Sequence, residues 1–204
     1  MNPLNSILRT IIVGVVVSIV IALLIGGYQF QFLPLGRWLH FLAGITWIGL
    51  LYYFNFVQVP AVARAAADTG GPGAAGISKY VAPLALAWFR WGAVVTWLSG
   101  AAYLWVRSPG GADFIGAFTL GLLGENLNLY QLVIGIGAWL GTIMLFNVWV
   151  LIWPNQKKLL GIVPASDEEK ARAKRTAFLA SRTNTLLSIP MLMCMGGASH
   201  GLPF

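Results

Sequence analysis

Charged residues are scarce in this chain of 204 residues, of which 58% are hydrophobic. Only 9% are charged, whereas a soluble domain carries about 25% because its surface faces water. The composition excludes soluble globular and disordered proteins and indicates that lipid is the solvent. A net charge of +7 is no argument for a nucleic-acid partner, because the basic residues fall mostly in loops, where membrane topology accounts for them.

Cysteine and acidic residues are scarce as well, with one cysteine and six acids in the whole chain. The single Cys194 excludes a disulfide framework, a Cys-x-x-Cys metal site and covalent attachment of c-type haem. Because Cys194 lies in an apolar run, we interpret it as a small packing residue. All six acids lie outside the long apolar runs, so no carboxylate is available inside them as a base.

Five apolar runs are long enough to cross a hydrocarbon core of about 30 Å, which takes about 20 helical residues. They cover residues 8–28, 35–59, 81–106, 129–153 and 176–199. The shorter apolar run 114–123 contains glycines and is a candidate re-entrant or interfacial segment. The sequence thus predicts an all-α integral membrane protein, a bundle of about five transmembrane helices in a single membrane domain spanning residues 1–204.

Two local signals concern the ends of the first and last spans. The first run is too long for a signal peptide and lacks a small-x-small cleavage site before Tyr28, so we expect a retained span. Ser166 and Glu169 have the spacing of a capping box. The last helix is therefore expected to begin in water near Asp167.

Lysine and arginine are distributed unevenly between the two sides of the predicted bundle. The opposite side from the N-terminus has only Arg37 and Arg107. The N-terminal side has Arg9, Arg64, Lys79, Lys157, Lys158, Lys170, Arg172, Lys174 and Arg175. Because basic loops stay inside, the N-terminus is predicted to be cytoplasmic and the C-terminus periplasmic or external.

The two histidines both fall near the external side, His40 in the second span and His200 at the end of the last. Two neutral imidazoles facing each other across a bundle are axial ligands of b-type haem, a cofactor that needs no covalent cysteine. Gly44 and Gly197 lie one turn from these histidines and leave room for a flat porphyrin. We therefore predict haem b, with its iron bound by His40 and His200.

Blander interpretations of the same residues stay open. Small residues are common at helix contacts in membranes, as expected for Gly137 and Gly141. His200 is also interpretable as an exposed chain end. Copper is a weaker prediction, because two histidines without a third ligand make a poor copper site.

Arg90 and Arg182 lie within predicted spans, in the cytoplasmic half. With no carboxylate nearby, the expected partners are backbone carbonyls, aromatic faces such as Trp88 or Trp91, water or an anion. Arg90 is a candidate for binding haem propionates, a quinone head group or an anionic substrate. The alternative is that both side chains extend to the cytoplasmic surface.

The run from His40 to Gly49, followed by Tyr53 and Phe54, resembles the opening of the urate oxidase N-terminal domain family. The resemblance continues in residues 97–100, 147–158 and 182–200. Members of that family are the membrane domains of bacterial urate hydroxylases that carry a C-terminal cytochrome c. The histidine–tryptophan–glycine pattern is also similar to that of the oxygen-independent protoporphyrinogen oxidase family and of copper-resistance membrane proteins.

The resemblance implies a redox role in the bacterial inner (cytoplasmic) membrane, with electrons leaving on the external side. Trp47, within the same run, joins the candidate cofactor-binding residues. The chain has no Cys-x-x-Cys-His, so it is expected to be a short, stand-alone member for which any cytochrome c would be a separate polypeptide.

Three functions follow as hypotheses. The leading one is a multi-pass redox subunit that binds b-type haem and passes electrons toward an external cytochrome c or a partner complex with other membrane subunits. The second is a cofactor-free accessory or structural subunit of a larger membrane complex. The third is a membrane-bound urate-type oxidase, although the sequence offers no conventional catalytic set for it. Whether the chain is an enzyme is left open.

Overall fold

The computed structural model describes residues 2–26 and 29–203. Within these residues the structure consists of helices and turns, with no strand among them, so the all-α prediction is confirmed. The chain separates into two compact units, Met1–Phe32 and Leu33–Phe204. The single membrane domain depends on how these units pack, and it stays a prediction.

The first unit contains η1 (Pro3–Asn5) and α1 (Ile7–Gly26). Isoleucine, valine and leucine side chains are exposed on all faces of α1. A helix that is apolar all round is typical of a membrane span. The predicted end of this span, Tyr28, lies outside the described residues.

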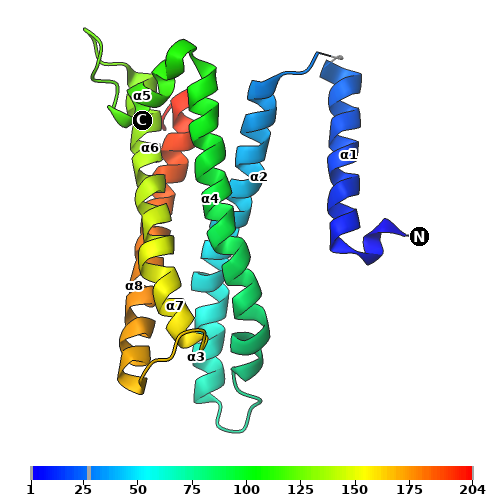
Figure 1. Ribbon diagram of the computed structural model, residues 1–204, viewed down its shortest axis with the longest axis vertical. Coiled ribbons are helices and arrows are strands. Elements are labelled where there is room, and N and C mark those ends of the chain that lie inside the picture. The colour runs from blue at the N-terminus through cyan, green and yellow to red at the C-terminus, as the bar shows by residue number, and fades with distance from the viewer. Residues whose placement is uncertain (1, 27–28, 204) are drawn as a thin grey trace. The chain divides into compact units, whose positions relative to one another are not determined.

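The second unit is an elongated bundle of helices (Figure 1). Its elements are α2 (Phe32–Tyr52), η2 (Tyr53–Gln58), α3 (Val59–Ala67), η3 (Ile77–Val81), α4 (Ala82–Arg107), η4 (Pro109–Gly111), α5 (Ala112–Phe118), α6 (Leu129–Phe146), η5 (Asn147–Ile152), α7 (Trp153–Leu159) and α8 (Asp167–His200). Consecutive elements join into continuous helices over Phe32–Ala67, Ile77–Arg107 and Leu129–Leu159.

Four helices among the described residues are long and apolar enough to cross a membrane: Ile7–Gly26, Phe32–Ala67, Ile77–Arg107 and Leu129–Leu159. The first four predicted spans fall on these helices. The fifth, 176–199, lies within α8, which is not among them. Its apolar residues are interrupted by Thr183, Asn184, Thr185, Ser188 and Pro190. The crossing of the membrane by α8 stays a prediction.

Each of the three continuous helices contains a π-helical segment, and each segment ends two residues before a proline. The segments η2, η3 and η5 are followed by Pro60, Pro83 and Pro154. At η2 the Val59 N–H donates to the Phe54 carbonyl, five residues back. Proline has no N–H and its ring collides with the carbonyl four residues earlier, so a wider turn lets the helix continue past it.

Helices of the second unit approach one another closely at two glycines. A Cβ on Gly137 of α6 would lie 3.2 Å from the Cβ of Cys194 on α8. Cys194 is buried, so its interpretation as a packing residue is confirmed. A Cβ on Gly92 of α4 would lie 3.4 Å from the backbone nitrogen of Trp47 on α2. Absent side chains therefore allow close helix contacts at both glycines.

Buried amides and a hydroxyl connect η2, η5 and α8 in what we call the central polar layer (Asn55, Asn147, Ser181, Asn184). Asn147 donates to Asn184 Oδ1 over 2.8 Å, and Asn184 donates to the Met144 carbonyl over 3.0 Å. Asn55 donates to Ser181 Oγ over 2.8 Å. Buried polar groups in lipid must find partners within the protein, and these side chains have them.

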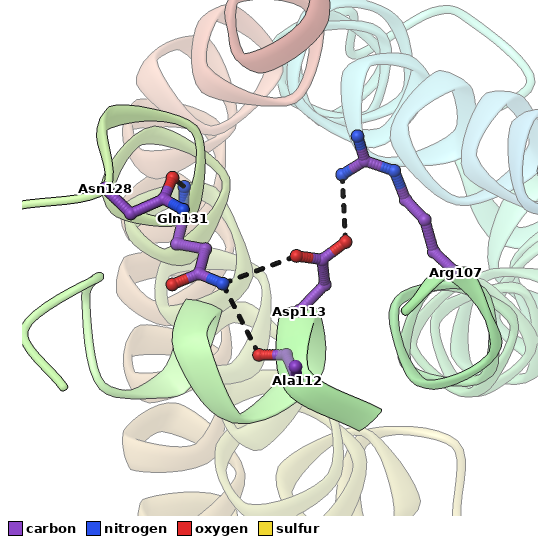
Figure 2. A network of polar contacts seen from close by, with 5 residues as sticks. All are labelled: Arg107, Ala112, Asp113, Asn128 and Gln131. Carbon is purple, nitrogen blue, oxygen red and sulfur yellow. Dashed lines mark hydrogen bonds and ion pairs between the residues drawn. The ribbon is translucent and has the colours of Figure 1, made fainter. Parts of the chain in front are cut away.

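Polar side chains join the ends of α4, α5 and α6 (Figure 2). Arg107 pairs with Asp113 over 3.2 Å, and Gln131 Nε2 donates to the other carboxylate oxygen of Asp113 over 3.3 Å. The same amide lies 3.5 Å from the Ala112 carbonyl, and Asn128 caps α6 by accepting from the Gln131 N–H. This network fixes α5 between the two long helices.

The candidate re-entrant segment 114–123 is formed by the end of α5 and a turn. The turn has positive φ at Leu120 and Gly121. The Ala117 carbonyl of α5 packs directly on Gly135 of α6, where any Cβ would collide with it. A helix of 7 residues is about 10 Å long, so α5 is too short to cross. The re-entrant or interfacial position of this segment stays a prediction.

The capping box at the start of α8 is confirmed. Ser166 Oγ accepts from the Glu169 N–H over 3.2 Å, and Glu169 Oε2 accepts from the Ser166 N–H over 2.9 Å. The bond from Ser166, and then the charge of Lys158 at 3.6 Å, hold the pKa of Glu169 below its ordinary value. The helix begins at Asp167, as predicted.

Candidate functional site

His40 lies on α2 and its imidazole packs against α4. Its Nδ1 is 2.8 Å from the Thr96 carbonyl oxygen. A carbonyl oxygen only accepts, so Nδ1 carries the hydrogen and donates it. The other ring nitrogen, Nε2, then keeps its lone pair. This hydrogen bond orients the ring and fixes its tautomer.

The ring lies over Gly100 of α4. A Cβ at that position would be 2.9 Å from Cε1 and 3.1 Å from Nδ1 of His40, closer than side chains approach one another. Ser99 Oγ is 3.4 Å from Nδ1 and donates to the Val95 carbonyl over 2.6 Å. We call His40, Thr96, Ser99 and Gly100 the His40 cluster.

His200 is the last residue of α8, and its side chain is exposed. The start of α2 and the end of α8 lie at the same end of the second unit (Figure 1). Within the described part of the chain, no hydrogen bond or ring contact joins His40 to His200. Binding of one haem iron by the two histidines stays a prediction.

The spaces beside the predicted pocket glycines contain side chains. A Cβ on Gly44 would be in ordinary contact with the Thr96 methyl group, at 3.7 Å. A Cβ on Gly197 would lie 2.5 Å from Leu202 Cδ2, because the chain folds back after α8. Gly196 has no atom within 4 Å of its Cβ position. Gly44 and Gly197 thus allow contacts within the protein.

Trp47 is buried, whereas Arg90, like His40, is half-buried. Trp47 is 2% exposed, and its Nε1 has no hydrogen-bond partner in the described structure. The Arg90 guanidinium lies over the ring of Trp153, with Cζ 3.8 Å from the centroid. A tryptophan face was an expected partner, but Trp153 of α7 provides it. Local spacing could not reveal a ring so distant in sequence.

Arg90 is six residues before Thr96 on α4, a distance of about 9 Å along the helix axis. Arg182, the other arginine within a predicted span, is exposed and lies 5.2 Å from the Phe178 ring centroid. Arg90 therefore lies apart from the His40 cluster along α4. Binding of haem propionates, a quinone or an anion by Arg90 stays a prediction.

The candidate metal donor in the His40 cluster is one imidazole nitrogen, Nε2 of His40. Over residues 2–26 and 29–203, no group of three or more His, Cys, Asp or Glu side chains is arranged to hold a metal ion. A macrocycle supplies most of its iron's ligands itself and needs only axial donors from the protein. The chemistry of the His40 cluster therefore fits an axial role.

A family model described as urate oxidase N-terminal matches residues 130–204. The predicted resemblance is confirmed over this range. The match covers α6, η5, α7 and α8 and includes His200, whereas His40 and Arg90 lie before it. Comparison with curated proteins and with solved structures found no match.

Sequence reasoning missed the contribution of α4 to the site. Thr96 directly precedes the run Trp97-Leu-Ser-Gly100, and Gly100 is its last residue. In the sequence this run indicates only the resemblance to the urate oxidase N-terminal domain family. A serine and a glycine in an apolar helix signal a close contact in general. They do not say which helix approaches, so the pairing with His40 needed the structure.

Proposed function

We propose that this chain is a redox subunit of a membrane complex, with His40 as an axial ligand of b-type haem. The observation that carries the proposal is the hydrogen bond from His40 Nδ1 to the Thr96 carbonyl at 2.8 Å. Histidines that bind metals usually donate their other N–H to a carbonyl or carboxylate, which fixes the ring and raises the basicity of the ligating nitrogen.

The His40 cluster is also suited to this role by its position in the chain. His40 lies on a helix long and apolar enough to span a membrane. Ionisable side chains in such helices are rare and often mark functional sites. Thr96 directs the ring, and Gly100 lets it lie against α4. Haem bound there would supply one-electron transfer; His200 is the proposed second ligand.

The proposed setting is the bacterial inner membrane, with five spans, a cytoplasmic N-terminus and an external C-terminus. Lysine and arginine counts support this orientation. In it the His40 cluster lies in the external half, where electrons would pass to a separate cytochrome c or to a partner subunit. The match to the urate oxidase N-terminal family over residues 130–204 supports a redox setting.

Two other functions have observations in their favour. The side chain of Leu202 at the Gly197 position favours a cofactor-free accessory subunit, because packing within the chain accounts for that glycine. The family match favours a urate-type oxidase. For that function, Arg90 would bind the anionic substrate while its guanidinium stacks on Trp153.

An absorbance spectrum of the protein purified in mild detergent tests the proposal. We expect a Soret band that shifts on reduction with dithionite and is lost in His40→Ala and His200→Ala. Leu39→Ala is the matched control, because it shortens an exposed side chain at the adjacent position of α2 and should keep the band.

The other outcomes separate the alternatives. A colourless wild-type protein overturns haem binding and favours the accessory role. A band that survives in His40→Ala contradicts the assignment of the ligand. Reduction of added cytochrome c that depends on urate would favour the oxidase.

A further inference from the structure

A shallow groove of about 390 Å³ lies between two of the long helices of the second unit. Leu50 and Tyr53 contribute to one wall. Tyr80, Leu84, Ala85 and Trp88 contribute to the other. Tyr80, Leu84 and Trp88 are spaced by four residues and share one helix face. The residues that line the groove include no charged side chain.

The groove is open, and its largest side chains are strongly exposed. Tyr80 is 65%, Leu84 68% and Trp88 62% exposed. Both walls belong to helices long and apolar enough to span a membrane. In a bilayer, such a surface contacts acyl chains, and a groove holds one chain more firmly than a flat face does because contacts surround it.

A cation lies beside Tyr80, the first lining residue on its helix. Lys79 Nζ is 5.4 Å from the centroid of the Tyr80 ring, and Tyr80 lines the groove. From Tyr80 to Trp88 the helix rises about 12 Å, so the apolar wall extends away from the ammonium group. The arrangement places a positive charge next to the apolar groove.

We propose that this groove binds one anionic phospholipid, with its acyl chain between Tyr53 and Leu84 and its phosphate at Lys79. Apolar walls select a chain, and the ammonium group of Lys79 selects a negative head group. The site is independent of the proposed haem function. In the proposed topology it lies in the cytoplasmic leaflet, where basic residues meet anionic lipids.

Native mass spectrometry of the detergent-purified chain, with added phosphatidylglycerol or phosphatidylcholine, tests the site. We expect one tightly retained phosphatidylglycerol, preferred over phosphatidylcholine. Lys79→Gln should reduce that preference about fivefold, since a basic residue near the membrane surface contributes about 1 kcal/mol toward anionic lipid. The matched control Lys174→Gln removes the same charge from an exposed position on α8 and should leave the preference unchanged.

A second variant tests the apolar wall separately. Ala85→Leu fills the groove and should lower retention of both lipids, whereas Lys79→Gln affects only the anionic one. Equal retention of the two lipids by the wild type overturns the proposal, as does an equal effect of Lys79→Gln and Lys174→Gln. Absence of a retained lipid, as when a second copy or another segment covers the groove, also overturns it.

Discussion

The central polar layer and the His40 cluster both place polar side chains between helices, but they satisfy those groups differently. Asn184 is fully buried and its amide bonds to Asn147 and to the Met144 carbonyl. His40 is only half-buried, and its Nδ1 donates to the Thr96 carbonyl while its Nε2 keeps its lone pair. A fully bonded amide stabilises the contact between helices, whereas a nitrogen that keeps its lone pair is available for chemistry.

The largest effect is expected from Asn184→Leu, which removes the centre of the polar layer. The Asn147 amide would lose its acceptor in a buried site, and the free energy of unfolding should fall by about 2 kcal/mol. Thermal unfolding in detergent, followed by circular dichroism, measures this. Thr183→Ala changes an exposed neighbour and should have little effect. Equal losses for the two variants would show that the polar layer is not the cause.

A smaller effect is expected from Gly100→Ala in the His40 cluster. The new methyl group would lie 2.9 Å from His40 Cε1, so the ring must move and its bond to Thr96 must lengthen. We expect a loss of about 1 kcal/mol, near the lower range for overpacking. Gly49→Ala is the control, because no atom lies within 4 Å of its Cβ position. A Gly100→Ala protein as stable as this control would contradict the close contact.

The smallest effect concerns pH and lies outside both regions, at the start of α8. The folded-state pKa of Glu169 is lowered, first by the Ser166 bond. The ionised Glu169 side chain therefore adds to the free energy of unfolding above the ordinary carboxyl pKa. This contribution is lost as the pH falls through the lowered pKa. The stability difference between wild type and Glu169→Gln should shrink over that acidic range. A difference that stays unchanged over that range would exclude the carboxylate's role.

The sequence predicted the features that depend on local pattern. Long apolar runs predicted the spans at 35–59, 81–106 and 129–153, and the spacing of Ser166 and Glu169 predicted a helix start. Contacts between helices were not predictable in the same way. Because these helices are apolar on most faces, the pattern does not show which face meets a neighbour, so Thr96 and Gly100 were missed beside His40.

The predicted fifth span, within α8, shows a different limit. Asn184 and Ser188 interrupt the apolar run of α8, yet both are fully buried against other helices. Hydropathy counts a polar residue as unfavourable in lipid wherever it points. A helix whose amides and hydroxyls bond to neighbouring helices therefore has a low mean hydropathy even where its other side chains are apolar.

The wide turns before Pro60, Pro83 and Pro154 have a consequence for the design of variants. A π-turn holds one residue more than an α-turn, so side chains beyond it are rotated by about 100° relative to an uninterrupted helix. Removing a single residue from η2 or η5 would restore ordinary pitch and rotate the following turns, without breaking the helix. These segments are therefore places where chain length, rather than residue type, decides which side chains face the bundle.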